Sequence, residues 1–291
     1  MRIDEYCEQR YLLEKSVGSA YGRNLLRWCG QFHEFARVTL KRLRVEQYNK
    51  WVVHLEQIGT YAPITIRKMS GGVLSVWNHA AKHGCAKWPE TGRIRRVQVV
   101  RRSPCAWTDG ELRDLLDVVR SVKGDFTFGV SKSLYYDAAL RVAYDTGLRR
   151  GDLFGLDVAD VARNGVISTV QGKTLEGHVC RVRPATHKSF VALANHIASV
   201  GLEHWQTPLK WPKSSMEQLY TGWRCIRWLA GVEKDGAFQM LRRTGATQVE
   251  IAQPGAATQF LGQLTPGLAQ QSYVDRAQLP AILPPDVEEA G

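Results

Sequence analysis

The sequence predicts a mainly α-helical protein with two domains, the second of which contains a small antiparallel β-sheet or hairpin. Apolar residues recur three and four apart along most of the chain, whereas they alternate with polar residues only near 165–184. Charge is divided unevenly as well: residues 1–103 carry a net charge of +11, and residues 104–291 carry none. A strongly basic first third is typical of a domain that binds the phosphates of a polyanion. We expect the second domain to have the more specific function.

The composition is that of a globular intracellular protein. With 44% hydrophobic residues, the chain has enough apolar material for two cores. Its six cysteines are widely separated and form no C-x-x-C pair, so neither a zinc site nor a secreted disulfide framework is indicated. No apolar run approaches the ~20 residues of a membrane span, and the first residues lack the apolar core of a signal peptide. We expect a reduced, soluble, cytoplasmic protein without a membrane partner, associated with the nucleoid if it is bacterial.

The first domain is predicted to be a small helical bundle. Its apolar spacing predicts four helical segments, at residues 6–13, 19–36, 44–58 and 64–83. Aromatic residues such as Trp28 and Trp77 fall on the apolar stripes and are expected in the core. The basic residues between the stripes are candidates for contacts with phosphates, namely Arg23, Arg27, Arg67 and Lys68.

Residues 86–107 are predicted to form an extended basic linker. They contain six basic residues and a single acidic one, Glu90, and prolines lie near both ends. Such a segment suits a strap along a phosphate backbone, and a merely solvated tether is the alternative. The candidates for phosphate contact in it are Arg95, Arg96, Arg101 and Arg102.

The second domain is predicted to begin with a capped helix. Thr108 is followed three residues later by Glu111, and the two form a capping box at the start of a segment with helical periodicity. The next helix is expected over residues 133–146 and should end at Gly147. Two arginines and Asp152 then interrupt an apolar stretch, and buried charges of this kind require partners. Asp152 can supply part of that pairing and a bound phosphate the rest.

Residues 165–184 change to a period of two, which predicts a β-hairpin. Its strands are expected at 166–170 and 179–183, with Lys173 at the tip of the connecting turn. Further helices are predicted over 188–200, 214–230 and 241–252, followed by an extended tail near 280–285.

The last part of the chain combines a phosphate-binding group with a possible nucleophile. Arg242 and Arg243 lie on the predicted helix, a Leu-Gly turn follows, and Tyr273 precedes Val-Asp. This order puts a guanidinium and a phenol on neighbouring elements. Taken separately, a solvated helix face and a packed tyrosine are the alternative interpretations of these residues.

In order and rough spacing, these motifs resemble those of the tyrosine recombinases, or phage-type integrases. Residues 146–153, TGLRRGDL, are similar to the first arginine motif, which would make Arg149 the active-site arginine. Lys173 falls where the family has its hairpin lysine, and Arg242 falls in the second arginine motif. Leu-Gly then precedes the last motif, which ends in Tyr273.

The resemblance covers nearly the whole chain. It implies an N-terminal helical core-binding (SAM-like) domain at 1–85, the linker at 86–107, and an α-rich catalytic domain with a C-terminal tail at 108–291. It also implies a site-specific DNA recombinase or integrase of a mobile genetic element, which cleaves and rejoins strands through a 3′-phosphotyrosyl intermediate. The implied partners are double-stranded DNA with a specific recombination site and further copies of the chain, as a homotetramer on two duplexes. No metal or other cofactor is implied.

The chemistry of strand transfer agrees with the order of the motifs. Two guanidinium groups, Arg149 and Arg242, can bind the non-bridging oxygens of the scissile phosphate by charge-assisted hydrogen bonds. Tyr273 can attack phosphorus and conserve the bond energy as an ester, so neither ATP nor a metal is needed. The resemblance assigns protonation of the leaving 5′-hydroxyl to Lys173.

Two positions depart from the family pattern. Gln239 stands three residues before the second arginine, where histidine is typical, and Gln263 follows Leu-Gly, where histidine or tryptophan is typical. The interval from Gln263 to Tyr273 is also one residue longer than usual. Glutamine can hydrogen-bond a phosphate oxygen, but it cannot accept and return a proton near neutral pH. His178 and His187, near the hairpin, either substitute for that function or are ordinary surface residues.

Two other functions fit the same sequence. The first is a catalytically impaired, recombinase-derived protein that still binds a specific DNA sequence, because the two glutamines would weaken proton transfer. The second is a relaxing topoisomerase with the same tyrosine chemistry, although the two-domain order and the Thr-Gly-Leu-Arg motif favour a recombinase. The candidate catalytic residues are Arg149, Lys173, Gln239, Arg242, Gln263 and Tyr273.

Overall fold

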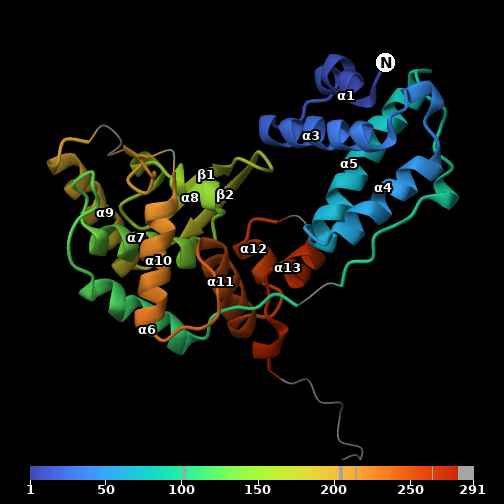
Figure 1. Ribbon diagram of the computed structural model, residues 1–291. Coiled ribbons are helices and arrows are strands. Elements are labelled where there is room, and N and C mark those ends of the chain that lie inside the picture. Colours follow the sequence, from blue (N-terminus) through green and yellow to red (C-terminus); the bar gives the residue numbers. More distant parts are fainter. Residues whose placement is uncertain (101–102, 203–205, 214, 264, 281–291) are drawn as a thin grey trace, which may run out of the picture. The chain divides into compact units, whose positions relative to one another are not determined.

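The computed structural model describes residues 1–100, 103–202, 206–213, 215–263 and 265–280 (Figure 1). The chain divides into two compact units, Met1–Arg101 and Arg102–Gly291, each with its own hydrophobic core. Helices predominate in both, and the strands of the described residues form one two-stranded antiparallel sheet. The predicted mainly helical fold with a small hairpin is therefore confirmed. No helix in these ranges combines the length and the apolar character that crossing a bilayer requires.

The first unit is a helical bundle whose long helices match the prediction closely. In chain order, its elements are α1 (Ile3–Tyr6), a π-helix (Cys7–Tyr11), α2 (Leu12–Glu14), α3 (Ser19–Ala36), a 3-10 turn (Leu40–Arg42), α4 (Val45–Ile58), α5 (Pro63–Lys82) and a 3-10 turn (Thr91–Arg93). The three long helices differ from the predicted ranges by at most one residue at either end. The opening of the chain is helical but less regular than expected, because the π-helical stretch interrupts it.

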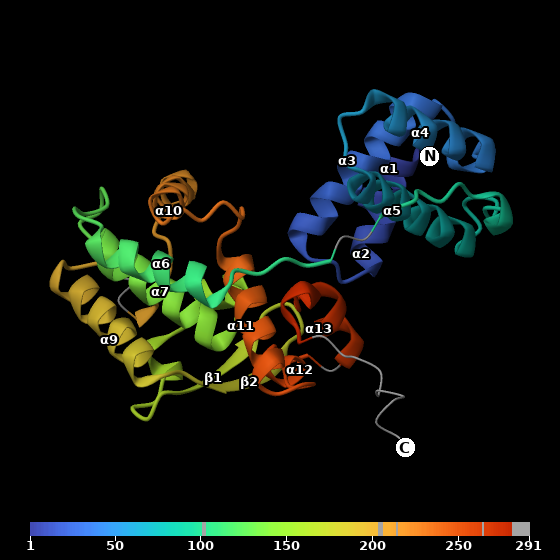
Figure 2. The ribbon, with the colours of Figure 1, turned by 90° about the horizontal axis from the view of Figure 1, so that it is seen from below.

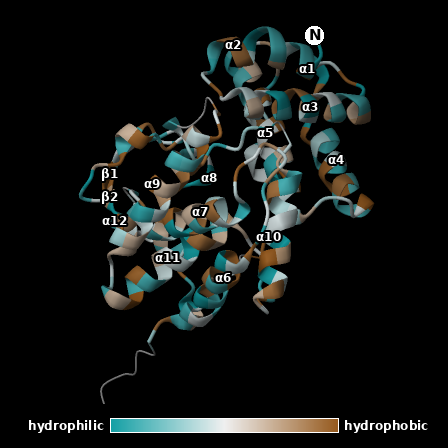
Figure 3. Ribbon diagram, turned by 90° about the vertical axis from the view of Figure 1, so that its left-hand side faces the viewer, coloured by the Kyte–Doolittle hydropathy of each residue, from teal (hydrophilic) through white to brown (hydrophobic). Residues whose placement is uncertain are grey.

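Large aromatic side chains fill the core of this unit, as the apolar stripes predicted. Trp51 and Trp77 are each 1% exposed. Both hydrophobic and hydrophilic residues occur along α4 and α5, as amphipathic helices require (Figure 3). Helices α3 and α5 approach each other closely at Gly72, where an added Cβ atom would lie 2.8 Å from Leu25 and 2.9 Å from the Trp28 ring.

Gly72→Ala is expected to destabilise the first unit by about 1–3 kcal/mol, because the new methyl group would clash with packed side chains that include a rigid indole. Gly71→Ala is the matched control, since Gly71 is exposed on the same helix and nothing lies within 4 Å of its added Cβ. That change should stabilise the unit by roughly 0.5–1 kcal/mol, because glycine in a helix costs backbone entropy. Thermal or urea unfolding measures the difference, and equal stability of the two variants would contradict the close approach of α3 and α5.

The predicted linker is extended, but its first half is not a free tether. Asn49 of α4 hydrogen-bonds this segment twice, donating to the Arg93 carbonyl at 2.8 Å and accepting from the Arg95 amide at 2.9 Å. Val97 is buried in the core of the first unit. The Arg95 guanidinium pairs with Glu56 at 2.8 Å. This half of the linker therefore belongs to the helical unit, because the bundle covers its apolar side chains.

The second unit begins with the predicted capped helix. In chain order, its elements are α6 (Asp109–Ser121), α7 (Lys132–Thr146), α8 (Arg150–Phe154), a 3-10 turn (Val158–Asp160), β1 (Val166–Gln171), β2 (Glu176–Arg181), α9 (Pro184–Ser199), α10 (Glu217–Leu229), α11 (Phe238–Ala252), α12 (Ala257–Phe260), α13 (Pro266–Ser272) and a 3-10 turn (Arg276–Gln278). Thr108 caps α6 by accepting a hydrogen bond from the Glu111 amide. Gly147 ends α7 in the left-handed conformation, as predicted.

Four predicted starts in this unit are wrong by three or four residues. Helix α9 begins at Pro184 rather than at 188, and helix α10 begins at Glu217 rather than at 214. Strand β2 begins at Glu176 rather than at 179, because Glu176 and Gly177 still pair with the last two residues of β1. Helix α11 begins at Phe238 rather than at 241, which places Gln239 in its first turn. Helices α8, α12 and α13 are not predicted from the apolar spacing, since none of them has more than seven residues.

Helix α7 packs against α6, α9 and α11 and so forms the centre of the second unit (Figure 1). Helices α12 and α13 follow α11 in the chain and lie beside it (Figure 2). There, Ala246, Leu261 and Val274 belong to a small separate core. The predicted extended tail near 280–285 lies, apart from Pro280, outside the described residues.

Candidate active site

The guanidinium of Arg242 is held between three elements of the second unit. Helix α11 carries Arg242 into the interior, where the residue is 1% exposed. Nη1 donates to the carbonyl oxygen of Gly147 at the end of α7, and Nη2 donates to that of Leu261 at 3.3 Å. Nε is buried and has no hydrogen-bond partner among the described residues. Burial lowers the pKa of Arg242 while the phenol of Tyr273 opposes that shift, so this buried cation favours an anionic ligand.

Arg149 is connected to Arg242 through a chain of hydrogen bonds. It stands directly before α8, after the left-handed turn that ends α7. Its Nη1 donates to Oε1 of Gln171, the last residue of β1, and Nε2 of Gln171 donates to the Leu261 carbonyl at 3.1 Å. Since Arg242 donates to the same carbonyl, Gln171 links the two arginines. Gln171 is buried, and the sequence motifs do not single it out.

The phenol of Tyr273 lies against Arg242. The tyrosine directly follows α13, and the guanidinium carbon of Arg242 is 4.7 Å from the centroid of its ring. Asp275 anchors the next residues, because its carboxylate accepts from the Ala106 amide at 2.9 Å and its own amide donates to Thr247 at 2.9 Å. A half-buried phenol is thereby fixed beside a cation.

The surroundings of Tyr273 favour its ionised form. Burial opposes ionisation, but the charges of Arg242 and Arg149 bring the pKa of Tyr273 below its usual value of 10.0. Hydrogen bonding by Arg242 and Gln239 acts in the same direction. Gln239 thus contacts the phenol from the first turn of α11. A lower pKa gives more phenolate near neutral pH, which makes the tyrosine a better nucleophile.

Arg149→Gln is expected to raise the pKa of Tyr273, because it removes one of the two positive charges that favour the phenolate. NMR titration of ring-labelled tyrosine measures this shift. Arg150→Gln is the matched control, since Arg150 is exposed and its guanidinium donates to the Tyr220 hydroxyl at 2.7 Å. The control should titrate like the wild type. Identical Tyr273 curves in the wild type and in Arg149→Gln would contradict the electrostatic coupling.

The turn after α12 brings a further polar group towards the arginines. Gly262 has a φ of +59°, and an added Cβ atom would lie 2.5 Å from Nδ1 of His178 and 2.6 Å from Nε2 of Gln171, so a side chain does not fit. In the next residue, Gln263, both amide atoms are buried without a hydrogen-bond partner in the described part of the chain. An unpaired buried polar group costs about 1–3 kcal/mol. These two atoms therefore suit a ligand with polar oxygens.

His178 lies in the interior beside these groups. It is 4% exposed on β2, its Nδ1 lies against Gly262, and its Nε2 has no hydrogen-bond partner among the described residues. Burial lowers the pKa of His178, and the charges of Arg242 and Arg149 lower it further. Both effects disfavour the protonated imidazole, whereas a backbone hydrogen bond to Thr146 acts in the opposite direction.

The surface interpretation of His178 is wrong. The signal for its burial is the alternation along β2, where the exposed Gly177 and Val179 flank the buried histidine. His187 lies on α9 instead, and within the described chain it makes no hydrogen bond or ion pair to the two arginines.

Comparison with known proteins identifies the fold of the chain. No family model matches the chain, and no curated protein matches it significantly. Among solved structures, a lambda integrase dimer bound to a COC′ core site matches at 16% identity over 98% of both chains, with a TM-score of 0.73. The Tn1549 transposon integrase in complex with a circular intermediate DNA matches at 12% identity over 94% of this chain and 95% of that chain, with a TM-score of 0.70. XerH recombinase bound to palindromic difH substrate matches at 13% identity over 95% of this chain and 81% of that chain, with a TM-score of 0.69.

The chain has the fold of the tyrosine recombinases. Within this recombinase fold, Arg149, Arg242, Gln239 and Tyr273 lie together, and Gln263 follows the glycine that contacts His178. No sequence motif marks Gln171, and the motifs do not decide whether His178 is buried.

Lys173 is not joined to the two arginines in this recombinase fold. It lies on the exposed turn of the hairpin and forms no hydrogen bond or ion pair within the described part of the chain. The turn itself is attached to the site, because the Gly172 amide donates to Asp152 at 2.9 Å. A long side chain on an anchored turn can extend towards a bound ligand.

The candidates for phosphate contact in the first unit of the recombinase fold lie on its surface. The exposed ones are Arg23 and Arg27 on α3, Arg67 and Lys68 on α5, and Arg95 and Arg96 after it. Arg101 and Arg102 lie outside the described residues. The same unit contains a group of possible metal ligands, Glu14, His79 and His83.

Proposed function

We propose that the protein is a site-specific tyrosine recombinase that cleaves and rejoins DNA through a 3′-phosphotyrosyl intermediate. One observation carries the proposal: Arg149 and Arg242 are linked through Gln171 and the Leu261 carbonyl, and the Tyr273 phenol lies against the second arginine. Two cations thus converge beside a nucleophile of lowered pKa. A phosphodiester is the ligand that uses all three groups.

In the proposed reaction, the two arginines bind the non-bridging oxygens and stabilise the charge that develops on them. The Tyr273 oxygen forms a bond to phosphorus, and the bond from phosphorus to the 5′-oxygen breaks. We propose that Lys173 extends from the hairpin turn to the bound phosphate and supplies the proton for the leaving 5′-hydroxyl. Attack by a 5′-hydroxyl on the phosphotyrosyl ester reverses these changes and rejoins a strand.

Gln239, Gln263 and His178 are proposed to take the remaining roles, which are hydrogen bonding to the reacting groups and removal of the tyrosine proton. Gln239 hydrogen-bonds the phenol, and the unpaired amide of Gln263 hydrogen-bonds a phosphate oxygen. Neither amide can carry a proton away from the attacking tyrosine. We propose that the imidazole of His178 does so, because its Nε2 is buried without a partner in the described chain.

The basic first unit is proposed to hold duplex DNA through phosphate contacts. Its net charge and the exposed arginines of α3 and α5 support this role. Lambda integrase, which has the same fold, is known as a tetramer bound to a Holliday junction. By analogy, we propose that four copies of this chain act on two duplexes at a specific site. We also propose that the protein recombines the DNA of a mobile genetic element.

A nicked suicide substrate tests this function. The DNA that flanks the gene supplies the sequence, and a nick close to the cleavage site lets the short leaving strand diffuse away. The wild-type chain should then accumulate as a covalent protein–DNA adduct that survives denaturation. Failure to form an adduct on DNA that the chain does bind would reject the catalytic proposal.

The two glutamines keep one alternative open, a recombinase-derived protein that binds DNA without cleaving it. It predicts salt-sensitive, sequence-selective binding and no adduct. Plasmid relaxation is a further readout of the same preparation. Relaxation of a plasmid that lacks the specific site would favour a relaxing topoisomerase.

A further inference from the structure

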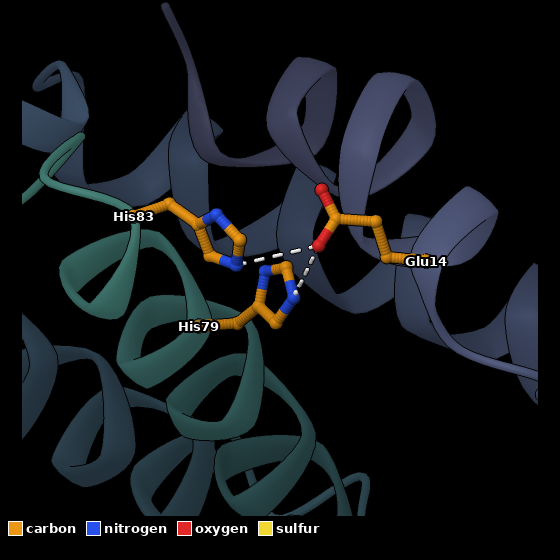
Figure 4. Close-up of side chains that lie close together, drawn as sticks. All are labelled: Glu14, His79 and His83. Atoms are coloured by element: carbon orange, nitrogen blue, oxygen red, sulfur yellow. Dashed lines mark ion pairs between the residues drawn. The ribbon is translucent and has the colours of Figure 1, made fainter.

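In the first unit, three potential metal ligands from two separate segments lie together. Glu14 ends α2, His79 lies in the last turn of α5, and His83 caps that helix. Oε2 of Glu14 is 3.1 Å from Nε2 of His79 and 3.3 Å from Nε2 of His83 (Figure 4). Both imidazoles therefore point the same ring nitrogen at one carboxylate oxygen.

These distances match the edges of a metal coordination sphere. In a tetrahedral zinc site with ligands at about 2.0–2.1 Å, neighbouring ligand atoms lie roughly 3.3–3.4 Å apart. In this group the three ligand atoms all lie within 4.8 Å of one another. The two histidines are four residues apart, which places them on one face of the helix. The separations of Glu14 from the two histidines are therefore close to those between neighbouring ligands of one ion.

The surroundings hold His79 in a defined orientation. It is 8% exposed, and its Nδ1 is 3.0 Å from the Tyr6 hydroxyl. The ring of Tyr11 meets it edge-on, with the centroids 5.1 Å apart. When Nδ1 carries the proton and donates to the Tyr6 oxygen, Nε2 turns its lone pair towards Glu14. An outer partner of this kind is typical of metal-binding histidines.

We propose that Glu14, His79 and His83 bind a divalent transition-metal ion, with zinc as the best fit. Two neutral imidazoles and one carboxylate form a ligand set that zinc accepts with water in the fourth position. Such an ion would fasten α2 to α5 and stabilise the start of the chain. The proposal does not depend on the DNA chemistry of the second unit. Its competitor is a metal-free cluster in which both Nε2 atoms carry protons and donate to Glu14.

Metal uptake by the full chain distinguishes the proposed zinc site from the metal-free cluster. Chelator-treated protein is dialysed against zinc chloride, and its zinc content and melting temperature are measured. About one tightly bound zinc per chain is expected, with a rise in melting temperature on the order of 10 °C at a hundredfold excess over Kd. With cobalt(II) the chain should show the absorption of a four-coordinate nitrogen and oxygen site. No rise in melting temperature, or a thiolate-to-cobalt band that points to cysteine, would overturn the proposal.

Matched variants locate the ion. Glu14→Gln and His83→Gln keep hydrogen-bonding groups but should each weaken zinc binding by roughly 100-fold or more. Glu8→Gln and His54→Gln are the controls, since both residues are exposed in the same unit and outside the group. They should bind zinc like the wild type. Circular dichroism checks that each variant folds, and equal uptake by the wild type and a folded Glu14→Gln/His83→Gln double variant would leave only the metal-free cluster.

Discussion

Tyr273→Phe should abolish the covalent adduct on a nicked substrate completely while leaving DNA binding intact. The change removes the hydroxyl that attacks phosphorus but keeps the ring that lies 4.7 Å from the Arg242 guanidinium. The fold and the position of the arginine should therefore persist. Denaturing gels detect the adduct, and mobility shifts on the same DNA measure binding.

Tyr220→Phe is the matched control for this substitution. The Tyr220 hydroxyl accepts a hydrogen bond from Arg150 at 2.7 Å, outside the group formed by the two linked arginines and Tyr273. This variant should form the adduct at the wild-type rate. An adduct of undiminished yield in Tyr273→Phe would mean that another residue is the nucleophile, and the assignment of the site would fail with it.

Replacing both glutamines by histidine should raise the cleavage rate by roughly 10²-fold or more, because general acid–base groups contribute about 10²–10⁴-fold. Gln239 already hydrogen-bonds the Tyr273 phenol, and the Gln263 amide is buried without a partner in the described chain. Gln239→His/Gln263→His would therefore place imidazoles where a proton can be accepted and returned. Single-turnover adduct formation measures the rate, and Gln253→His, at an exposed position after α11, is the control.

The same experiment tests the role of His178. His178→Gln should slow cleavage in the natural chain and slow it much less once the two glutamines are histidines, because proton transfer then has another route. An equal loss in both backgrounds would make His178 a packing residue of β2. An unchanged cleavage rate in the glutamine-to-histidine variant would show that proton transfer does not limit the cleavage rate of the natural chain.

Local signals in the sequence were enough to predict most of the fold. The capping box at Thr108 and the glycine at 147 mark helix ends that the structure reproduces, because both depend on nearby residues alone. The long helices of the first unit follow from their apolar spacing. The short helices before Tyr273 do not, since α12 and α13 are too short for a periodic pattern. They are held by tertiary packing, α12 against α11 and α13 against α12.

The site was predictable where its residues lie in motifs and not where tertiary contacts create it. Arg149, Arg242 and Tyr273 stand in recognisable positions along the chain. Gln171 has no such mark, because its role depends on the Leu261 carbonyl, 90 residues away, lying within 3.1 Å of its amide. His178 likewise acquires its importance from Gly262, whose missing side chain lets the turn close over the imidazole.

Besides the phenol of Tyr273, two main-chain carbonyls hold the Arg242 guanidinium, those of Gly147 and Leu261. Every residue type offers such a carbonyl, so these two contacts depend on the path of the backbone and not on the side chains at 147 and 261. Substitutions can accumulate around the guanidinium without moving it, provided that the turns keep their course. Most side chains on this backbone differ from those of the integrases that share the fold, since the identity to two of them is 16% and 12%.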